Sequence, residues 1–214
     1  MTSITNQNQK FICKKEEIIV HPPKAARTVQ GMREQGYTQE NAIEDIIDNS
    51  IAANATRIIV HIYLDENIIP IVTIADNGIG MNRTKLLDGM AIGSDERTDK
   101  KSLGKFGMGL KTASWAMCKK LTVITKDEMQ SINAAEWDLD RIQSDNEWHL
   151  SLRSPNNQEI KTLEEAADKG SGTLVKWERC DKLLGHEYTY RAHAENSLNK
   201  LIENIRKSVA ETYH

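Results

Sequence analysis

Apolar residues recur along the chain at two spacings, and each spacing predicts one kind of secondary structure. Steps of three and four residues predict helices over 24–35, 39–54, 82–90, 108–117 and 190–213. Runs rich in β-branched residues predict strands over 57–64, 68–75, 121–125, 131–137, 148–152 and 173–177. Residues 65–67 are expected to join the first two strands in a hairpin. This order of elements predicts the α+β class, as a two-layer α/β sandwich with a largely antiparallel sheet.

Two stretches interrupt the pattern. Residues 1–20 precede Pro22 and Pro23, and we expect them to form a flexible arm or an unanchored leading strand ahead of one domain over 21–214. Residues 93–107 are charged, contain glycine and show no periodicity, which predicts a long mobile loop.

Composition excludes several classes of protein. No apolar run approaches the roughly 18 to 20 residues that cross a bilayer, and the N-terminus has no apolar signal core, so we expect a cytoplasmic protein that contacts no membrane. Lys and Arg number 28 against 31 Asp and Glu, and the net charge of −3 gives no support to non-specific DNA binding. The three cysteines lack metal-ligand spacing and are expected to be reduced thiols.

The first candidate for chemistry is the pair Asp45 and Asn49 on the second predicted helix. Residues four apart share a helix face, so both side chains can aim an oxygen at one point. An Asn carbonyl suits Mg²⁺, and a carboxylate one turn earlier could orient or deprotonate water. An amphipathic helix with solvated acids explains the same residues, and the pattern alone does not exclude it.

The second candidate is the segment from Asp76 to Gly80, directly after a predicted strand. Gly78 and Gly80 let the backbone approach a flat ligand closely. The carboxylate of Asp76 can accept a hydrogen bond from an exocyclic amine such as that of adenine, which distinguishes adenine from guanine. A simple strand-ending turn favours the same residue types, so this alternative stays open.

The third candidate is the glycine-rich segment 104–112, which opens a helix. Free backbone N–H groups and the positive end of a helix dipole form an anion site for phosphates. Leu110 stands before Lys111 and Thr112, so the segment is not a P-loop, and it contains no dinucleotide fingerprint. A fourth, weaker segment runs from Gly170 to Thr173, before the late strand.

In this order and spacing, the four segments resemble the GHKL ATPase superfamily of gyrase-type topoisomerases, heat-shock chaperones, histidine kinases and MutL proteins. The resemblance covers about residues 20–178. Its four boxes correspond to Asp45 through Asn49, to Asp76 through Gly80, to Gly104, Gly107 and Gly109, and to Gly172-Thr173. The segments 107–111 and 36–37 resemble the bacterial MORC-like branch.

The resemblance implies a Bergerat fold with helices on one face of the sheet, where ATP or ADP lies beneath residues 93–107 as a lid. It implies Asn49 as the ligand of Mg²⁺ and Asp45 as the catalytic residue. The other implied nucleotide contacts are Asp76 and Thr173 at the adenine amino group, Gly78, Gly80 and Met81 around the base, and Gly104, Gly107, Met108 and Gly109 at the phosphates. Lys111 is a plausible phosphate partner, with Lys105 as its rival, but Lys111 could equally face solvent on its helix.

Two positions depart from the family pattern. Hydrolysing members place Glu where this chain has Asp45, and the neighbouring Glu44 is turned about 100° away along the helix. A positioned general base contributes roughly 10²–10⁴ in rate, so we expect slow, partner-dependent hydrolysis. Ala52 stands where members often have Asp, which removes one polar contact.

The resemblance also bears on partners. Related ATPases continue into a transducer domain that supplies a lysine to the γ-phosphate, so we expect an N-terminal module that acts with a downstream domain or partner protein and forms an ATP-dependent homodimer. DNA binding is expected by family analogy only. Three alternatives remain: a nucleotide-binding switch without hydrolysis, a protein-interaction module without nucleotide, and a histidine-kinase catalytic domain. The last is disfavoured because the one upstream histidine, His21, lies against Pro22.

Overall fold

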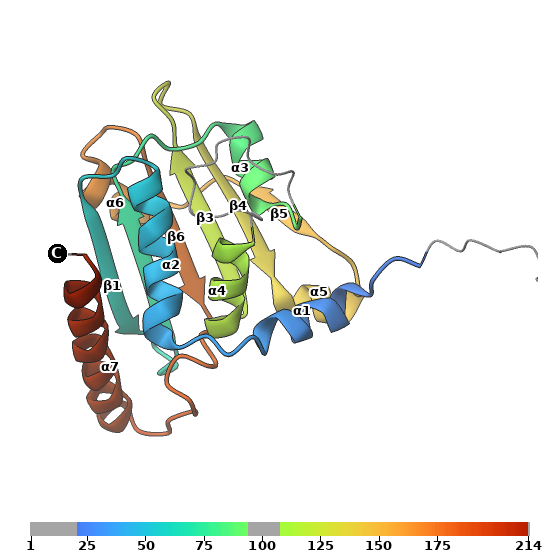
Figure 1. Ribbon diagram of the computed structural model, residues 1–214, viewed down its shortest axis with the longest axis vertical. Coiled ribbons are helices and arrows are strands. Elements are labelled where there is room, and N and C mark those ends of the chain that lie inside the picture. Colours follow the sequence, from blue (N-terminus) through green and yellow to red (C-terminus); the bar gives the residue numbers. More distant parts are fainter. Residues whose placement is uncertain (1–20, 94–107, 214) are drawn as a thin grey trace, which may run out of the picture.

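The computed structural model describes residues 21–93 and 108–213, and one six-stranded sheet forms its centre (Figure 1). The strands are β1 (Ile58–Leu64), β2 (Pro70–Asp76), β3 (Lys120–Lys126), β4 (Ile132–Asp138), β5 (Leu150–Arg153) and β6 (Gly172–Glu178). In space they run β1-β2-β6-β3-β4-β5, and every neighbouring pair is antiparallel. The predicted α+β sandwich is confirmed, and the late strand β6 lies at its middle, between β2 and β3.

Five helices lie where the hydrophobic periodicity predicts them. These are α1 (Ala25–Arg33), α2 (Gln39–Ala52), α3 (Arg83–Met90), α4 (Gly109–Met117) and α7 (Arg191–Thr212). Two further helices, α5 (Leu139–Asp145) and α6 (Asn157–Ala167), were not predicted. The predicted arm 1–20 and nearly all of the predicted loop 93–107 lie outside the described residues.

The main core lies between one face of the sheet and the helices that cover it. Val72 and Ile74 of β2 belong to the same buried cluster as Ile43 and Ile46 of α2 and Trp115 of α4. Figure 1 shows α2 and α4 side by side across this face, with α7 beside β1 at its edge. Burial of this continuous apolar surface is the main favourable contribution to folding.

Helix α6 covers the opposite face, so the helices are not all on one side. Leu163, Ala166 and Ala167 of α6 form a second buried cluster with residues such as Ile124 and Leu174 of the sheet. Successive residues of a strand point to opposite faces, and β2, β3 and β6 are buried along nearly their whole length. The second face carries apolar residues at Ala75, Ile124 and Leu174, and α6 covers them.

Within residues 21–93 and 108–213, every helix is too short or too polar to cross a lipid bilayer.

Candidate functional site

The carboxylate of Asp76, at the end of β2, is only 4 % exposed and accepts three hydrogen bonds. The hydroxyl of Ser50 on α2 donates to its Oδ2 at 2.8 Å. The backbone N–H groups of Gly78 and Thr173 donate to its Oδ1 at 2.8 and 3.2 Å. Burial raises the pKa of Asp76 above its ordinary value, although the three donated bonds act in the opposite direction. A carboxylate has about four acceptor positions, so one is left for a further donor.

The glycines after Asp76 are required by the chain's own backbone. Gly80 has a φ of +62°, and a Cβ there would lie 2.0 Å from the carbonyl oxygen of Lys126. A Cβ on Gly78 would lie 2.7 Å from the carbonyl oxygen of Ala53. On β6, a Cβ on Gly172 would lie 2.2 Å from the carbonyl oxygen of Asp76 itself. Side chains at these positions would therefore push apart the segments that hold the Asp76 carboxylate.

A second group of polar contacts joins the turn after Asp76 to strands β3 and β6. The Thr125 hydroxyl accepts from the backbone N–H of Met81 at 2.8 Å and donates to the carbonyl of Gly172 at 3.1 Å. It also lies 3.2 Å from the Thr173 hydroxyl. Ser171 donates to the carbonyl of Gly78 at 2.8 Å. These bonds fix the predicted site residues Met81 and Thr173 beside Asp76.

Helix α2 brings Asp45 and Asn49 together as their spacing predicts. The helix begins at Thr38, whose side chain accepts from the N–H of Asn41. Asn49 is exposed, and its Nδ2 donates to the Asp45 carbonyl at 2.7 Å. The carboxylate of Asp45 is half-buried, and its Oδ2 accepts from the Tyr37 hydroxyl at 2.8 Å. Burial and the Asp45 carboxylate raise the pKa of Tyr37, so the hydroxyl remains a donor.

The neighbouring acid, Glu44, points away from this pair. Its carboxylate accepts from the Ser208 hydroxyl of α7 at 2.6 Å. This confirms the expectation that Glu44 cannot take the place of Asp45 without a shift of the helix.

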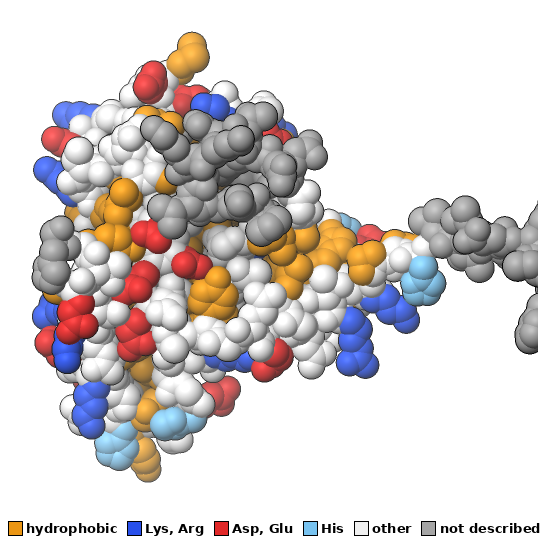
Figure 2. Space-filling view, in the orientation of Figure 1, with side chains coloured by type: hydrophobic (Ala, Val, Ile, Leu, Met, Phe, Trp, Pro, Cys, Tyr) orange, Lys and Arg blue, Asp and Glu red, His pale blue; other side chains and the backbone are white. Residues whose placement is uncertain are grey.

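The surface over α2 is acidic. The helix carries Glu40, Glu44, Asp45 and Asp48 and no Lys or Arg. Figure 2 shows the acidic side chains gathered on this part of the face. A polyanionic ligand placed beside α2 would be repelled unless a cation lay between them.

Asn49 is suited to such a cation. No group of three or more His, Cys, Asp or Glu side chains among the described residues could hold a metal ion. Mg²⁺ does not need one, because it keeps several waters and takes one or two protein ligands together with phosphate oxygens. The Nδ2 of Asn49 is engaged by the helix, so its Oδ1 is the atom that the residue can offer to a metal.

The first turn of α4 lies against the Asp45 side of α2. A Cβ on Gly109 would lie 3.9 Å from the Oδ2 of Asp45. Met108 occupies the N-cap position, and its side chain makes no cap bond among the described residues. The positive end of the helix dipole lies here, beside Asp45. The predicted phosphate contacts Gly104 and Gly107, and the rival Lys105, lie outside the described residues.

Lys111 on α4 is fully buried, so the alternative in which it faces solvent is wrong. Its ammonium donates to the carbonyl of Gly89 on α3 at 2.7 Å. The side chain thus connects two helices of the site face, and its contact with phosphate stays a prediction.

Sequence reasoning missed four residues of this site: Tyr37, Ser50, Thr125 and Ser171. Each side chain bonds a partner that the fold brings near it. Ser50 of α2 reaches Asp76 of β2, and Thr125 of β3 reaches Met81 in the turn after β2. Of these four, Ser50 could have been found from the sequence. It stands four residues after Ile46, which places its hydroxyl on the buried face of α2.

Residues 37–173 match the family model described as histidine kinase-, DNA gyrase B-, and HSP90-like ATPase. The matched segment includes Tyr37 and Asp45 near its start and Thr173 at its end. No curated protein matches the sequence.

Proposed function

The chain belongs to the histidine kinase-, DNA gyrase B-, and HSP90-like ATPase family, and on that premise we propose that it is a Mg²⁺-dependent ATP-binding domain that hydrolyses ATP slowly. The family assignment supports the binding of ATP and ADP. The arrangement of the described residues supports the preference for adenine, the need for a metal and the slow turnover.

The observation that carries the proposal is the buried Asp76 carboxylate with three donors and one open acceptor position. The amino group of adenine donates a hydrogen bond and fills that position. Guanine presents a carbonyl oxygen at the same place, and two acceptors facing each other in a buried site repel. Asp76 therefore selects adenine over guanine, with Gly78, Gly80, Met81 and Thr173 forming the surroundings of the base.

The triphosphate lies between α2 and the start of α4 in this proposal. Mg²⁺ bound at Asn49 would neutralise the repulsion between the phosphates and the acidic residues of α2. The N–H groups at the start of α4, at Met108 and Gly109, donate to phosphate oxygens with the helix dipole behind them. Gly104 and Gly107 extend this cradle, and Lys111 stabilises it through α3.

Asp45 orients the water that attacks the terminal phosphate. One carboxylate oxygen accepts from Tyr37, which leaves the other for water. One oxygen of Asp45 is already engaged by Tyr37, and the side chain is one methylene shorter than Glu. Both features reduce the rate, and they favour a nucleotide-binding switch without useful hydrolysis as the second candidate function.

We further propose that ATP closes residues 93–107 over the site and drives the association of two copies or the movement of a downstream transducer domain or partner. The MORC-like branch is supported by the segments 36–37 and 107–111. A histidine-kinase-type domain is the less favoured alternative.

Isothermal titration tests the base contact. The unmodified chain is expected to bind Mg·ATP at least about tenfold more tightly than Mg·GTP, since one hydrogen bond to a charged group contributes about 1.5–3 kcal/mol. Asp76→Asn places an NH₂ group where acceptors are needed and should lower ATP affinity about ten- to a hundredfold. Asp88→Asn, at an exposed acid of α3, is the matched control and should bind as the unmodified chain does. Equal affinity of Asp76→Asn and the control would reject the proposal.

A further inference from the structure

Helix α2 presents three different stripes of side chains to three neighbours. Its buried stripe, which includes Ile43, Ile46 and Ile47, faces the sheet. Asp45 and Asn49 form the stripe of the candidate site, and Glu44 and Asp48 form the stripe toward α7. Because successive residues differ by about 100° around the helix, a displacement of one stripe moves the others with it.

The end of α7 holds the stripe of Glu44 and Asp48 through hydroxyl groups. Ser208 and Thr212, one turn apart on α7, both donate to the Oε1 of Glu44, at 2.6 and 3.3 Å. The hydroxyl of Tyr213, which directly follows α7, lies 2.6 Å from the Oδ1 of Asp48 and 3.2 Å from the carbonyl oxygen of Glu44. Four contacts from three residues thus tie the end of α7 and the residue after it to the middle of α2.

The Tyr213 hydroxyl has one proton for these two acceptors. The shorter contact is to a carboxylate, and a hydrogen bond to a charged acceptor is about twice as strong as one to a neutral carbonyl, so the proton is directed at Asp48. Burial and the charges of Asp48, Glu44 and Asp45 raise the pKa of Tyr213, so the hydroxyl remains a donor at neutral pH.

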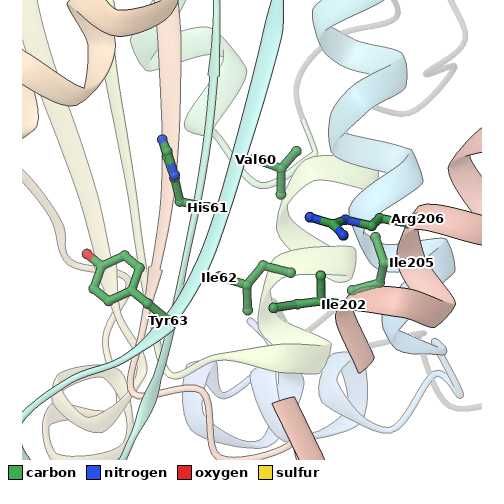
Figure 3. A pocket seen from close by; sticks show the side chains of 7 residues that line it. All are labelled: Val60, His61, Ile62, Tyr63, Ile202, Ile205 and Arg206. Atoms are coloured by element: carbon green, nitrogen blue, oxygen red, sulfur yellow. The ribbon is translucent and has the colours of Figure 1, made fainter. Parts of the chain in front are cut away.

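Leu201 and Ile205 of α7 are buried in the main core, but the space between α7 and the sheet is not completely filled. Between α7 and β1 lies a hollow of about 320 Å³. Figure 3 shows Val60 and Ile62 pointing from β1 toward Ile202 and Ile205 of α7, whereas His61 projects the other way. Because packing is incomplete beside β1, the polar bonds at the end of α7 contribute to the position at which it meets α2.

We propose that Tyr213 is a positioning residue of the nucleotide site: its bond to Asp48 sets the place of the α2 turn that carries Asp45 and Asn49. The effect on ligand affinity rests on the proposed function, because the position of Asn49 changes affinity only if Mg·ATP binds there. Tyr213 itself touches neither of these two side chains in any described contact.

The test compares Tyr213→Phe with Tyr188→Phe. The Tyr188 hydroxyl donates to Ser197 of α7 at 2.7 Å, so the control removes a similar bond at the other end of the same helix without touching α2. In the nucleotide-free protein, Tyr213→Phe should speed amide hydrogen exchange at residues 45–49 about three- to tenfold, and the control should not. Tyr213→Phe should also weaken Mg·ATP about three- to tenfold while the affinity for adenosine, which carries no phosphate, stays unchanged.

Unchanged exchange at residues 45–49 would overturn the inference. So would a Mg·ATP affinity equal to that of the control, or an equal loss for adenosine, which would indicate general destabilisation. If the unmodified chain binds neither ligand, the proposed function fails, whereas the exchange measurement still decides whether Tyr213 positions α2. The two failures are therefore distinguishable.

Discussion

At the scale of single residues, the candidate site consists of acidic and amide side chains whose orientation is set by neutral donors. The Asp76 carboxylate accepts hydrogen bonds from Ser50 and two backbone N–H groups, and the Asp45 carboxylate accepts one from Tyr37. Within residues 21–93 and 108–213, no Lys or Arg side chain donates a hydrogen bond to either carboxylate. Both carboxylates therefore keep capacity for a ligand instead of being neutralised within the protein.

The length of the side chain at position 45 is expected to limit hydrolysis. Asp45→Glu adds one methylene and should raise ATP turnover about tenfold or more, toward the roughly 10²–10⁴ that a well-placed general base contributes. Phosphate release measures this effect, with Asn49→Ala giving the background rate. Turnover in Asp45→Glu that stays at the background rate would show that position 45 is not the limiting feature.

At the scale of elements, helix α6 depends on one buried carboxylate. Asn156 and Glu159 form a capping box at its start, and Arg153 donates to both oxygens of Glu159 at 2.7 Å. Burial alone would raise the pKa of Glu159, but the bonds from Arg153 and Asn156 and the charges of Arg153 and Lys176 together lower it to about 2. Since the folded pKa is below the unfolded value, Glu159 stabilises the fold above about pH 4.5, and this contribution is lost as the pH falls through about 2.

Glu159→Gln should therefore lower the free energy of unfolding at pH 7 by about 1–3 kcal/mol. The same substitution should flatten the dependence of stability on pH between about 4.5 and 2. Urea denaturation at several pH values measures both effects. Glu165→Gln is the control, because Glu165 lies on the same helix, its side chain is 48 % exposed, and its ion pair among the described residues is with His61. If both variants show the same pH dependence, the Glu159 contribution is refuted.

Local patterns were sufficient to predict five of the described helices, the strands and the pairing of Asp45 with Asn49. Helix α6 also had a local signal, since Asn156 and Glu159 have capping-box spacing before Ile160 and Leu163. No local signal places α6 on the second face of the sheet, because its position depends on which strands are buried on both faces. The same holds for Thr125, which meets Met81 and Thr173 only because β6 inserts between β2 and β3.

At the scale of the whole molecule, the fold connects the proposed adenine site to the proposed metal site through few elements. Asp76 on β2 is bonded to Ser50 of α2, and the same helix presents Asn49 one residue earlier. The end of α7 holds α2 from its other side. In the proposed function, adenine and the phosphates would both contact residues held by this one helix, so a shift of α2 could couple the nucleotide state to a partner.

The most direct test of the central claim is a crystal structure of the chain with ADP and Mg²⁺. We expect the adenine amino group within hydrogen-bonding distance of the Asp76 carboxylate, and the Asn49 amide oxygen directed at the metal and the phosphates. A nucleotide bound elsewhere, or a base with no contact to Asp76, would contradict it.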